Sequence, residues 1–126
     1  MNARTILYVE DNEYNRKIVR QLLARTSYRL IEAQDGEAGV EAARRELPDL
    51  ILMDVQLPKM SGLDATRALR ADERTKDTPI VIITSFAMSG DRERATAAGA
   101  SGYLAKPYSP RELLAMVRQF LPEETS

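Results

Sequence analysis

Five short apolar segments alternate with five amphipathic segments along this chain, and this alternation limits its possible folds more than any other feature. The apolar segments predict strands over residues 5–9, 29–33, 50–54, 80–83 and 103–105. Near-helical spacing of apolar residues predicts helices over residues 13–25, 36–45, 63–70 and 91–98, and a fifth helix after residue 109. The continuous apolar run Leu50–Met53, closed by Asp54, is typical of a strand buried on both faces of a sheet.

The order of these segments predicts the fold class. Alternating strands and helices indicate a parallel sheet with helices on both faces, and right-handed crossovers restrict its topology. We therefore expect a flavodoxin-like α/β fold, in which a doubly wound five-stranded parallel sheet of strand order 2-1-3-4-5 forms a three-layer sandwich. The chain has 126 residues, 44% of them hydrophobic, so we expect residues 1–126 to form a single domain around one core.

Two helix ends carry specific signals. Gly99 follows the fourth amphipathic segment and is expected to end that helix. Ser109 and Glu112 form the pattern of a capping box, with Pro110 at the first helical position, so the last helix should begin there.

The composition excludes several classes of function. With 18 basic and 19 acidic residues the net charge is -1, so no basic patch for nucleic acid is expected. There is no cysteine for a disulfide or a thiolate metal site, and no apolar run approaches the roughly 18–20 residues that cross a bilayer. We expect a soluble, cytoplasmic protein without nucleic-acid or membrane partners. The chain also lacks histidine, which excludes Ser-His-Asp hydrolysis and means that any phosphohistidine belongs to another protein.

Polar residues stand where four of the predicted strands end. These residues are Glu10 and Asp11 after the first strand, Asp54 at the end of the third, Thr84 at the end of the fourth, and Lys106 after the fifth. In a doubly wound sheet the carboxyl ends of the strands form the binding site, so these side chains are expected to converge. Their hard oxygen ligands suit Mg²⁺, for which Mn²⁺ can substitute.

The same residue types suit phosphoryl transfer. This reaction needs a nucleophile in line with the phosphorus and positive charge or hydrogen-bond donors around the three equatorial oxygens. Asp54 can serve as the nucleophile, while Lys106 and the Thr84 hydroxyl can contact the phosphoryl oxygens. Each residue alone has an ordinary interpretation: Asp11 as a turn residue, Thr84 as a strand-end cap, Lys106 as a solvated lysine. Their occurrence together at four strand ends favours a functional site.

The motifs resemble those of CheY-like receiver domains of two-component response regulators, from Ile6 to about Leu121. The matching segments are Val9-Glu10-Asp11-Asn12, residues 48–58, Met60-Ser61-Gly62-Leu63, residues 79–85 and residues 99–107. Residues 9–15 and Phe86-Ala87-Met88 are most similar to the corresponding segments of stand-alone DivK-like regulators and of receivers fused to hybrid sensor kinases. The first acid is Glu10 where many members have Asp, a change that keeps the carboxylate.

The resemblance implies a role for each matching residue. Asp54 would accept a phosphoryl group from a histidine kinase or a histidine phosphotransfer protein. The metal ligands would be Asp11 directly, Glu10 mainly through metal-bound water, Asp54, and the backbone carbonyl of Gln56. Thr84 and Tyr103 would form the switch, and the face of the fourth helix, fifth strand and fifth helix would bind a downstream protein. We expect a signalling domain that phosphorylates and dephosphorylates itself, not an enzyme with a separate substrate.

Further expectations concern backbone geometry, water access and output. The Lys106–Pro107 peptide bond is expected to be cis, because the lysine must turn back over the sheet immediately after the fifth strand. Gln56 and Phe86 are expected to border the path by which water reaches a phosphorylated Asp54. No residue follows Ser126, so output is expected through protein contact or through onward transfer to a histidine phosphotransfer protein.

Two alternatives remain open from the sequence. One is a flavodoxin-like nucleotide or flavin binder, since the expected fold is shared; its first loop, however, carries Glu10 and Asp11, which repel phosphate unless a cation intervenes. The other is a pseudo-receiver that docks partners without being phosphorylated, although such proteins usually lose the acids or the lysine that this chain retains.

Overall fold

The computed structural model describes residues 4–85 and 90–122, and its centre is a parallel five-stranded sheet. Its strands are β1 Thr5–Val9, β2 Arg29–Ala33, β3 Leu50–Asp54, β4 Ile80–Thr84 and β5 Gly102–Ala105. They lie in the order β2-β1-β3-β4-β5, and every neighbouring pair is parallel. This confirms the predicted fold class and strand order.

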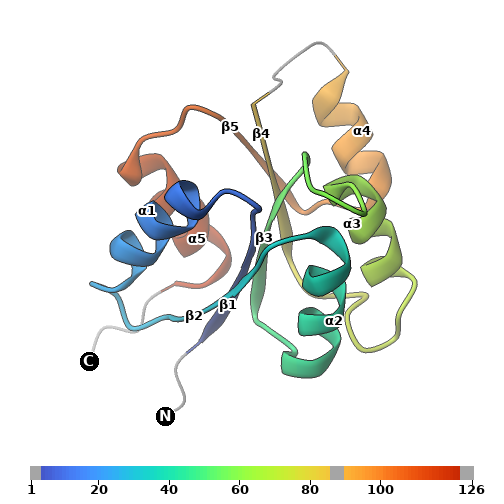
Figure 1. The fold of residues 1–126 in the computed structure, drawn as a ribbon, viewed down its shortest axis with the longest axis horizontal. Coiled ribbons are helices and arrows are strands. Elements are labelled where there is room, and N and C mark those ends of the chain that lie inside the picture. The colour runs from blue at the N-terminus through green and yellow to red at the C-terminus, as the bar shows by residue number, and fades with distance from the viewer. Residues whose placement is uncertain (1–3, 86–89, 123–126) are drawn as a thin grey trace.

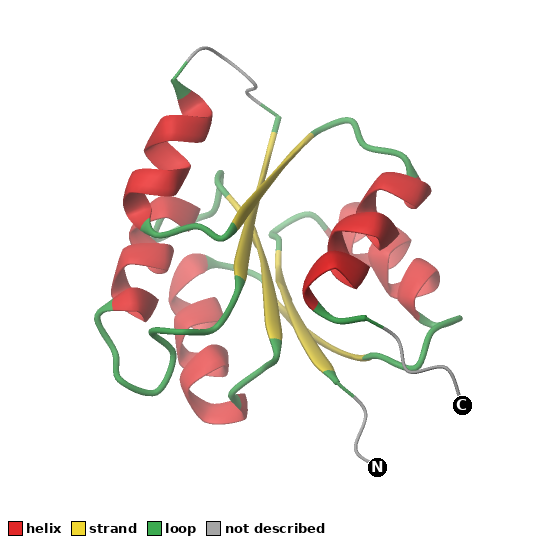
Figure 2. Ribbon diagram, turned by 180° about the vertical axis from the view of Figure 1, so that it is seen from behind, coloured by secondary structure: helices red, strands yellow, loops and turns green. Residues whose placement is uncertain are grey.

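Five helices cover the two faces of this sheet in the described part of the chain. They are α1 Glu13–Leu23, α2 Gly36–Glu46, α3 Gly62–Arg70, α4 Asp91–Ala98 and α5 Pro110–Phe120. Figure 1 shows α1 and α5 on one side of the sheet and α2, α3 and α4 on the other. The view from behind shows the same three layers, with the strands between the two groups of helices (Figure 2).

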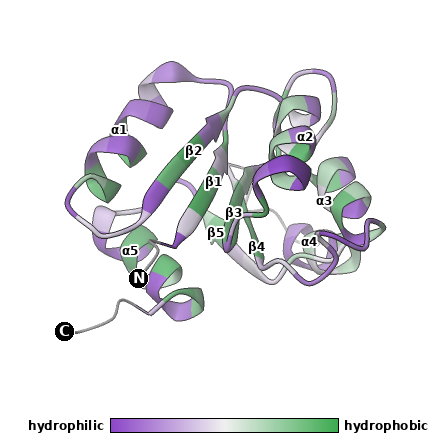
Figure 3. Ribbon diagram, turned by 90° about the horizontal axis from the view of Figure 1, so that it is seen from below, coloured by the Kyte–Doolittle hydropathy of each residue, from purple (hydrophilic) through white to green (hydrophobic). Residues whose placement is uncertain are grey.

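Each face of the sheet has its own apolar core, because successive residues of a strand point to opposite faces. In β1, Ile6 and Tyr8 pack in the core beside α1 and α5, whereas Leu7 and Val9 pack in the core beside α2 and α3. Figure 3 shows the hydrophobic strands in the middle and hydrophilic residues on the outer sides of the helices. Among the described residues, no helix is long and apolar enough to cross a membrane.

Side-chain caps fix where most of the helices begin. Asn12, Asp35, Ser61 and Ser109 each accept a hydrogen bond from a backbone N–H in the first turn of the helix that follows. The predicted capping box at Ser109 is present in full, and the expected end of α4 at Gly99 is observed with a left-handed φ of 108°. These caps hold the loops that leave the carboxyl ends of the strands.

Some predicted helix and strand ends differ from the observed ones by one or two residues, whereas β1, β2, β3 and α4 have the predicted bounds. The first helix was expected to reach Arg25 but ends at Leu23. The Thr26 hydroxyl and the Thr26 backbone N–H both donate to the Leu23 carbonyl, which turns the chain away from the helix. α3 begins one residue earlier than predicted because Ser61 caps it.

The start of α3 lies directly against the backbone that follows β3. The Gly62 N–H donates to the Val55 carbonyl at 2.9 Å. A side chain on Gly62 would clash with the backbone carbonyl of Asp54, so only glycine permits this approach. The close packing fixes the loop that carries Asp54 at the carboxyl edge of the sheet.

Candidate functional site

Two acidic side chains and one lysine meet at the carboxyl edge of the sheet. The Lys106 Nζ lies 2.6 Å from Asp54 Oδ2 and 3.0 Å from Glu10 Oε1. Both acids are buried, with relative exposures of 4% for Asp54 and 2% for Glu10. Buried charges are costly unless they are paired, and here one ammonium compensates two carboxylates.

The sheet topology explains how these three residues meet although they are far apart in sequence. Asp54 ends β3, Glu10 follows β1, and Lys106 follows β5. The Lys106 N–H donates to the Thr84 carbonyl at 2.7 Å, which ties the lysine to the end of β4. The Lys106–Pro107 peptide bond is cis, the isomer that the sequence predicted.

The pKa of Lys106 reflects its partners. Burial lowers this pKa, but the hydrogen bonds and charges of Asp54 and Glu10 outweigh burial, so the pKa lies above the usual lysine value. The lysine is therefore a full positive charge at neutral pH. A fixed cation at this position attracts any anionic group that approaches Asp54.

Hydrogen bonds fix the orientation of the Asp54 carboxylate. Its Oδ1 accepts from the Gln56 backbone N–H at 2.8 Å, and its Oδ2 faces Lys106. Gln56 itself is exposed in the loop after β3. The carboxylate is thus held by the backbone on one side and by the ammonium on the other.

Glu10 is held by residues to which the sequence assigned no role. Its Oε1 accepts from the Tyr8 hydroxyl at 3.2 Å, and its Oε2 accepts from the Asn12 N–H at 3.2 Å. The buried Arg16 donates to the Glu10 backbone carbonyl at 2.8 Å and pairs with Glu13 at 3.0 Å. The position of Tyr8, two residues before Glu10, was the available signal for its role.

Two of the three carboxylates that were expected to converge, those of Glu10 and Asp54, share a contact with Lys106. Asp11 is exposed in the loop that leads to α1. Residues 4–85 and 90–122 contain no group of three or more acidic, histidine or cysteine side chains placed to hold a metal ion. Asp11 directly follows Glu10 in the sequence and stays a predicted metal ligand. The ammonium of Lys106 supplies the positive charge that holds the acid pair of Glu10 and Asp54 together.

The donor set nevertheless suits Mg²⁺. This ion binds proteins through one or two carboxylates, keeps several waters and accepts phosphate oxygens. Glu10 and Asp54 are two carboxylates that already face one cation, the Lys106 ammonium. With Asp11 and the Gln56 carbonyl in the adjoining loops, these oxygens could hold the metal.

Thr84 and Tyr103 line one pocket. Thr84 is buried at the end of β4, and Tyr103 lies in β5. Together with Leu63, Asp91 and Ala95 they border a pocket of about 190 Å³ between the sheet and α4. The guanidinium of Arg92 lies over the Tyr103 ring, 4.9 Å from its centre. Burial raises the pKa of Tyr103, so its hydroxyl is neutral at physiological pH.

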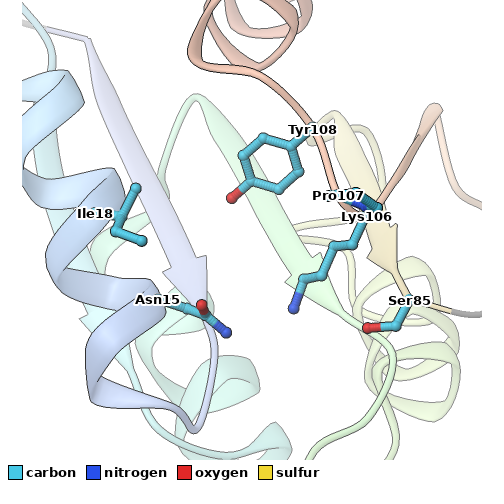
Figure 4. A pocket seen from close by; sticks show the side chains of 6 residues that line it. All are labelled: Asn15, Ile18, Ser85, Lys106, Pro107 and Tyr108. Atoms are coloured by element: carbon cyan, nitrogen blue, oxygen red, sulfur yellow. The ribbon is translucent and has the colours of Figure 1, made fainter.

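A second, open groove reaches the lysine from the other side of the sheet. It has a volume of about 490 Å³, and its lining comes from Asn15 and Ile18 of α1 and from Ser85, Lys106, Pro107 and Tyr108 (Figure 4). The groove leads from the surface to the Lys106 ammonium. Phe86, expected to border the water path with Gln56, lies outside the described residues.

This arrangement defines a class of protein: a doubly wound α/β domain with a buried carboxylate and a lysine at the carboxyl edge of its sheet. The family model of the response regulator receiver domain matches residues 6–118 of the chain. The chain therefore belongs to the response regulator receiver domains of two-component signalling. This membership argues against the alternative of a nucleotide or flavin binder.

Individual relatives agree with this assignment. The polar-differentiation response regulator DivK of Brucella ovis is 39% identical over 119 residues, which cover 94% of this chain and 97% of that protein. The receiver domain of the sensor histidine kinase PA1611 from Pseudomonas aeruginosa PAO1 is 39% identical with a TM-score of 0.87. The match covers 94% of this chain and 97% of that one, and that structure has a magnesium ion in its active-site cleft. The chemotaxis response regulator CheY4 of Vibrio cholerae is 30% identical with a TM-score of 0.89. The match covers 94% of this chain and 99% of that one.

Proposed function

We propose that this chain accepts a phosphoryl group on Asp54 from a phosphohistidine of a histidine kinase or a histidine phosphotransfer protein. The observation that carries the proposal is the contact of 2.6 Å between the Lys106 ammonium and the buried Asp54 carboxylate. The phosphohistidine must lie outside these 126 residues, because they contain no histidine. The donor would reach Asp54 along the groove beside Lys106.

The chemistry of the step follows from the chain's own groups. A carboxylate oxygen of Asp54 forms a bond to phosphorus while the phosphorus–nitrogen bond of the donor imidazole breaks, and the nitrogen leaves with the electron pair. Lys106 is placed to move from Asp54 to an equatorial oxygen of the transferred group, where it balances negative charge. The Thr84 hydroxyl can donate to another oxygen. Mg²⁺, held by Glu10, Asp11, Asp54 and the Gln56 carbonyl, would supply further positive charge at those oxygens.

Beryllofluoride with Mg²⁺ tests this function, because it mimics an aspartyl phosphate without a covalent transfer. We expect amide resonances near Asp54 and Thr84 to shift in nuclear magnetic resonance spectra, while residues at the opposite edge of the sheet, such as Asp49, stay unchanged. An unchanged spectrum at millimolar beryllofluoride would contradict the proposal. It would favour the alternative in which the chain docks partners without phosphorylation.

We further propose that phosphorylation moves Thr84 and Tyr103 and thereby changes the face of α4, β5 and α5 that binds a downstream protein. A phosphoryl group adds about two negative charges and new acceptors, which attract the Thr84 hydroxyl. Movement of Thr84 would enlarge the pocket of about 190 Å³ that it shares with Tyr103 and admit the tyrosine ring. The two states would then differ in the contacts that a switch requires.

The ring resonances of Tyr103 report this switch directly. On addition of beryllofluoride and Mg²⁺ they should shift in the unmodified protein, and the shift should fall by at least about half in Thr84→Val, which removes the attracted hydroxyl. Tyr28, whose hydroxyl donates to the Leu121 carbonyl away from the site, is the internal control and should not respond. A Tyr103 ring that is the same with and without beryllofluoride would rule out this switch.

A further inference from the structure

The hydroxyl of Tyr8 reaches the functional site from inside the core. Tyr8 is fully buried in β1, in the apolar cluster beside α1 and α5. Its hydroxyl lies 3.2 Å from Glu10 Oε1. Glu10 directly follows β1, and its N–H still donates to the Ala33 carbonyl of β2, so its side chain lies on the same face as that of Tyr8. A buried tyrosine hydroxyl requires a polar partner, and here the partner is a carboxylate of the site.

The direction of this hydrogen bond is set by the chemistry of its partners. An ionised carboxylate only accepts, so Tyr8 donates its single proton to Glu10. The Tyr8 hydroxyl also interacts with the hydroxyl of Tyr108. The two tyrosine hydroxyls and the Glu10 carboxylate therefore form one polar cluster.

Three hydrogen-bond donors together restrict the Glu10 carboxylate to one orientation. Tyr8 and Lys106 both donate to Oε1, at 3.2 and 3.0 Å, and the Asn12 N–H donates to Oε2 at 3.2 Å. Rotation of the carboxylate would break all three hydrogen bonds. Of these donors, Lys106 would have to leave Glu10 to contact a phosphoryl group. Tyr8 and Asn12 would then be the remaining restraints on the carboxylate.

We propose that Tyr8 is a positioning residue for the Mg²⁺-dependent site, with its hydroxyl, supported by Tyr108, holding Glu10 in the orientation that serves the metal. This inference rests on the proposed function, because it assumes that Mg²⁺ binds beside Asp54. It assigns a role in phosphoryl transfer to a core residue. It also connects the site to Tyr108, which lines the groove beside Lys106.

The test is the Mg²⁺ affinity of Tyr8→Phe, which removes the hydroxyl and keeps the ring in the core. Hydrogen-bond partners of metal ligands typically change metal affinity about 10–100-fold, so we expect a weakening of about tenfold. The dissociation constant is measured by titrating Mg²⁺ alone and following the amide resonances of Asn12 and Gln56. Tyr108→Phe should give a smaller loss in the same direction, and it provides a second test if Tyr8→Phe does not fold.

Tyr28→Phe is the matched control. The hydroxyl of Tyr28 is also buried, and it donates to the Leu121 carbonyl at the opposite end of the same core. Its loss should lower thermal stability as the loss of the Tyr8 hydroxyl does, but should leave the Mg²⁺ affinity unchanged. If both Tyr8→Phe and Tyr108→Phe bind Mg²⁺ as tightly as the unmodified protein does, the positioning role is wrong, while the proposed function still stands. Failure of the unmodified protein to bind Mg²⁺ would overturn the proposed function and this inference with it.

Discussion

Replacing Asp54 by asparagine should abolish phosphorylation and leave the fold intact. The amide has nearly the same shape, and its oxygen can still accept from the Gln56 N–H as Asp54 Oδ1 does at 2.8 Å. It is, however, a poor nucleophile and a weak metal ligand. We expect the rate of phosphorylation by acetyl phosphate with Mg²⁺ to fall by more than about a thousandfold, equivalent to about 4 kcal/mol of activation free energy.

Mass spectrometry of the intact protein measures this reaction, and circular dichroism checks the fold. Asp64→Asn is the matched control, since Asp64 is an exposed aspartate of α3 that pairs with Arg67 at 2.9 Å. That variant should be phosphorylated at the rate of the unmodified protein. Phosphorylation of Asp54→Asn at an appreciable rate would show that the acceptor is another residue.

Replacing Lys106 by methionine should impair both the reaction and the stability of the protein. Methionine keeps most of the side-chain length but removes the charge that lies 2.6 Å from Asp54 and 3.0 Å from Glu10. We expect phosphorylation to slow by at least about a hundredfold, because the transferred oxygens lose a cation. The two carboxylates would also repel each other without their shared partner. Since the site borders an open groove, the free energy of unfolding at pH 7 should fall by about 2 kcal/mol, less than the 3–5 kcal/mol typical of a fully buried pair.

The stability difference between Lys106→Met and the unmodified protein should depend on pH in a defined way. Because the folded-state pKa of Lys106 is raised, the stability from its charge is present in full below the unfolded-state pKa near 10.5. It is lost as the pH rises through the higher folded-state value. Urea denaturation at pH 8 and above pH 11 measures the stability difference between the two proteins, which should be smaller at the higher pH. A difference that stays constant or grows would contradict the ion pairing.

Lys59→Met is the control for this prediction. Lys59 is exposed and lies 3.7 Å from Asp35, so its loss removes a surface ion pair at a distance from the acid pair. Surface pairs contribute about 0–1 kcal/mol, and the variant should keep the normal phosphorylation rate. Equal effects of the two lysine substitutions would mean that Lys106 acts only through the overall charge of the protein.

Much of the fold was predictable because it depends on local sequence patterns. The β3 segment Leu50–Asp54 is continuously apolar, and the structure buries all five residues. The capping box at Ser109 and the glycine at position 99 fixed two helix ends as predicted. The end of α1 was missed by two residues, because the turn there depends on the Thr26 hydroxyl rather than on apolar periodicity.

The sequence by itself also determined which chemistry is open to the protein. Acids, a hydroxyl and a lysine stand at strand ends, and the topology rule for doubly wound sheets places such ends at one edge. From that rule alone Asp54, Glu10 and Lys106 could be expected to meet, and the structure places them within hydrogen-bonding distance. The absence of histidine likewise excluded a phosphohistidine within the chain.

Only the tertiary structure decided how the side chains of the site are oriented. Whether Asp11 joins Glu10 and Asp54 depends on the path of the loop into α1, and in the structure Asp11 is exposed. The Tyr8 hydroxyl and the buried Arg16 guanidinium hold Glu10 through contacts of 3.2 and 2.8 Å. Strand and helix patterns report which face a residue occupies, but they carry no distance between side chains from different elements. Those distances arise when the sheet and its helices pack, and they place the Lys106 ammonium between two buried acids.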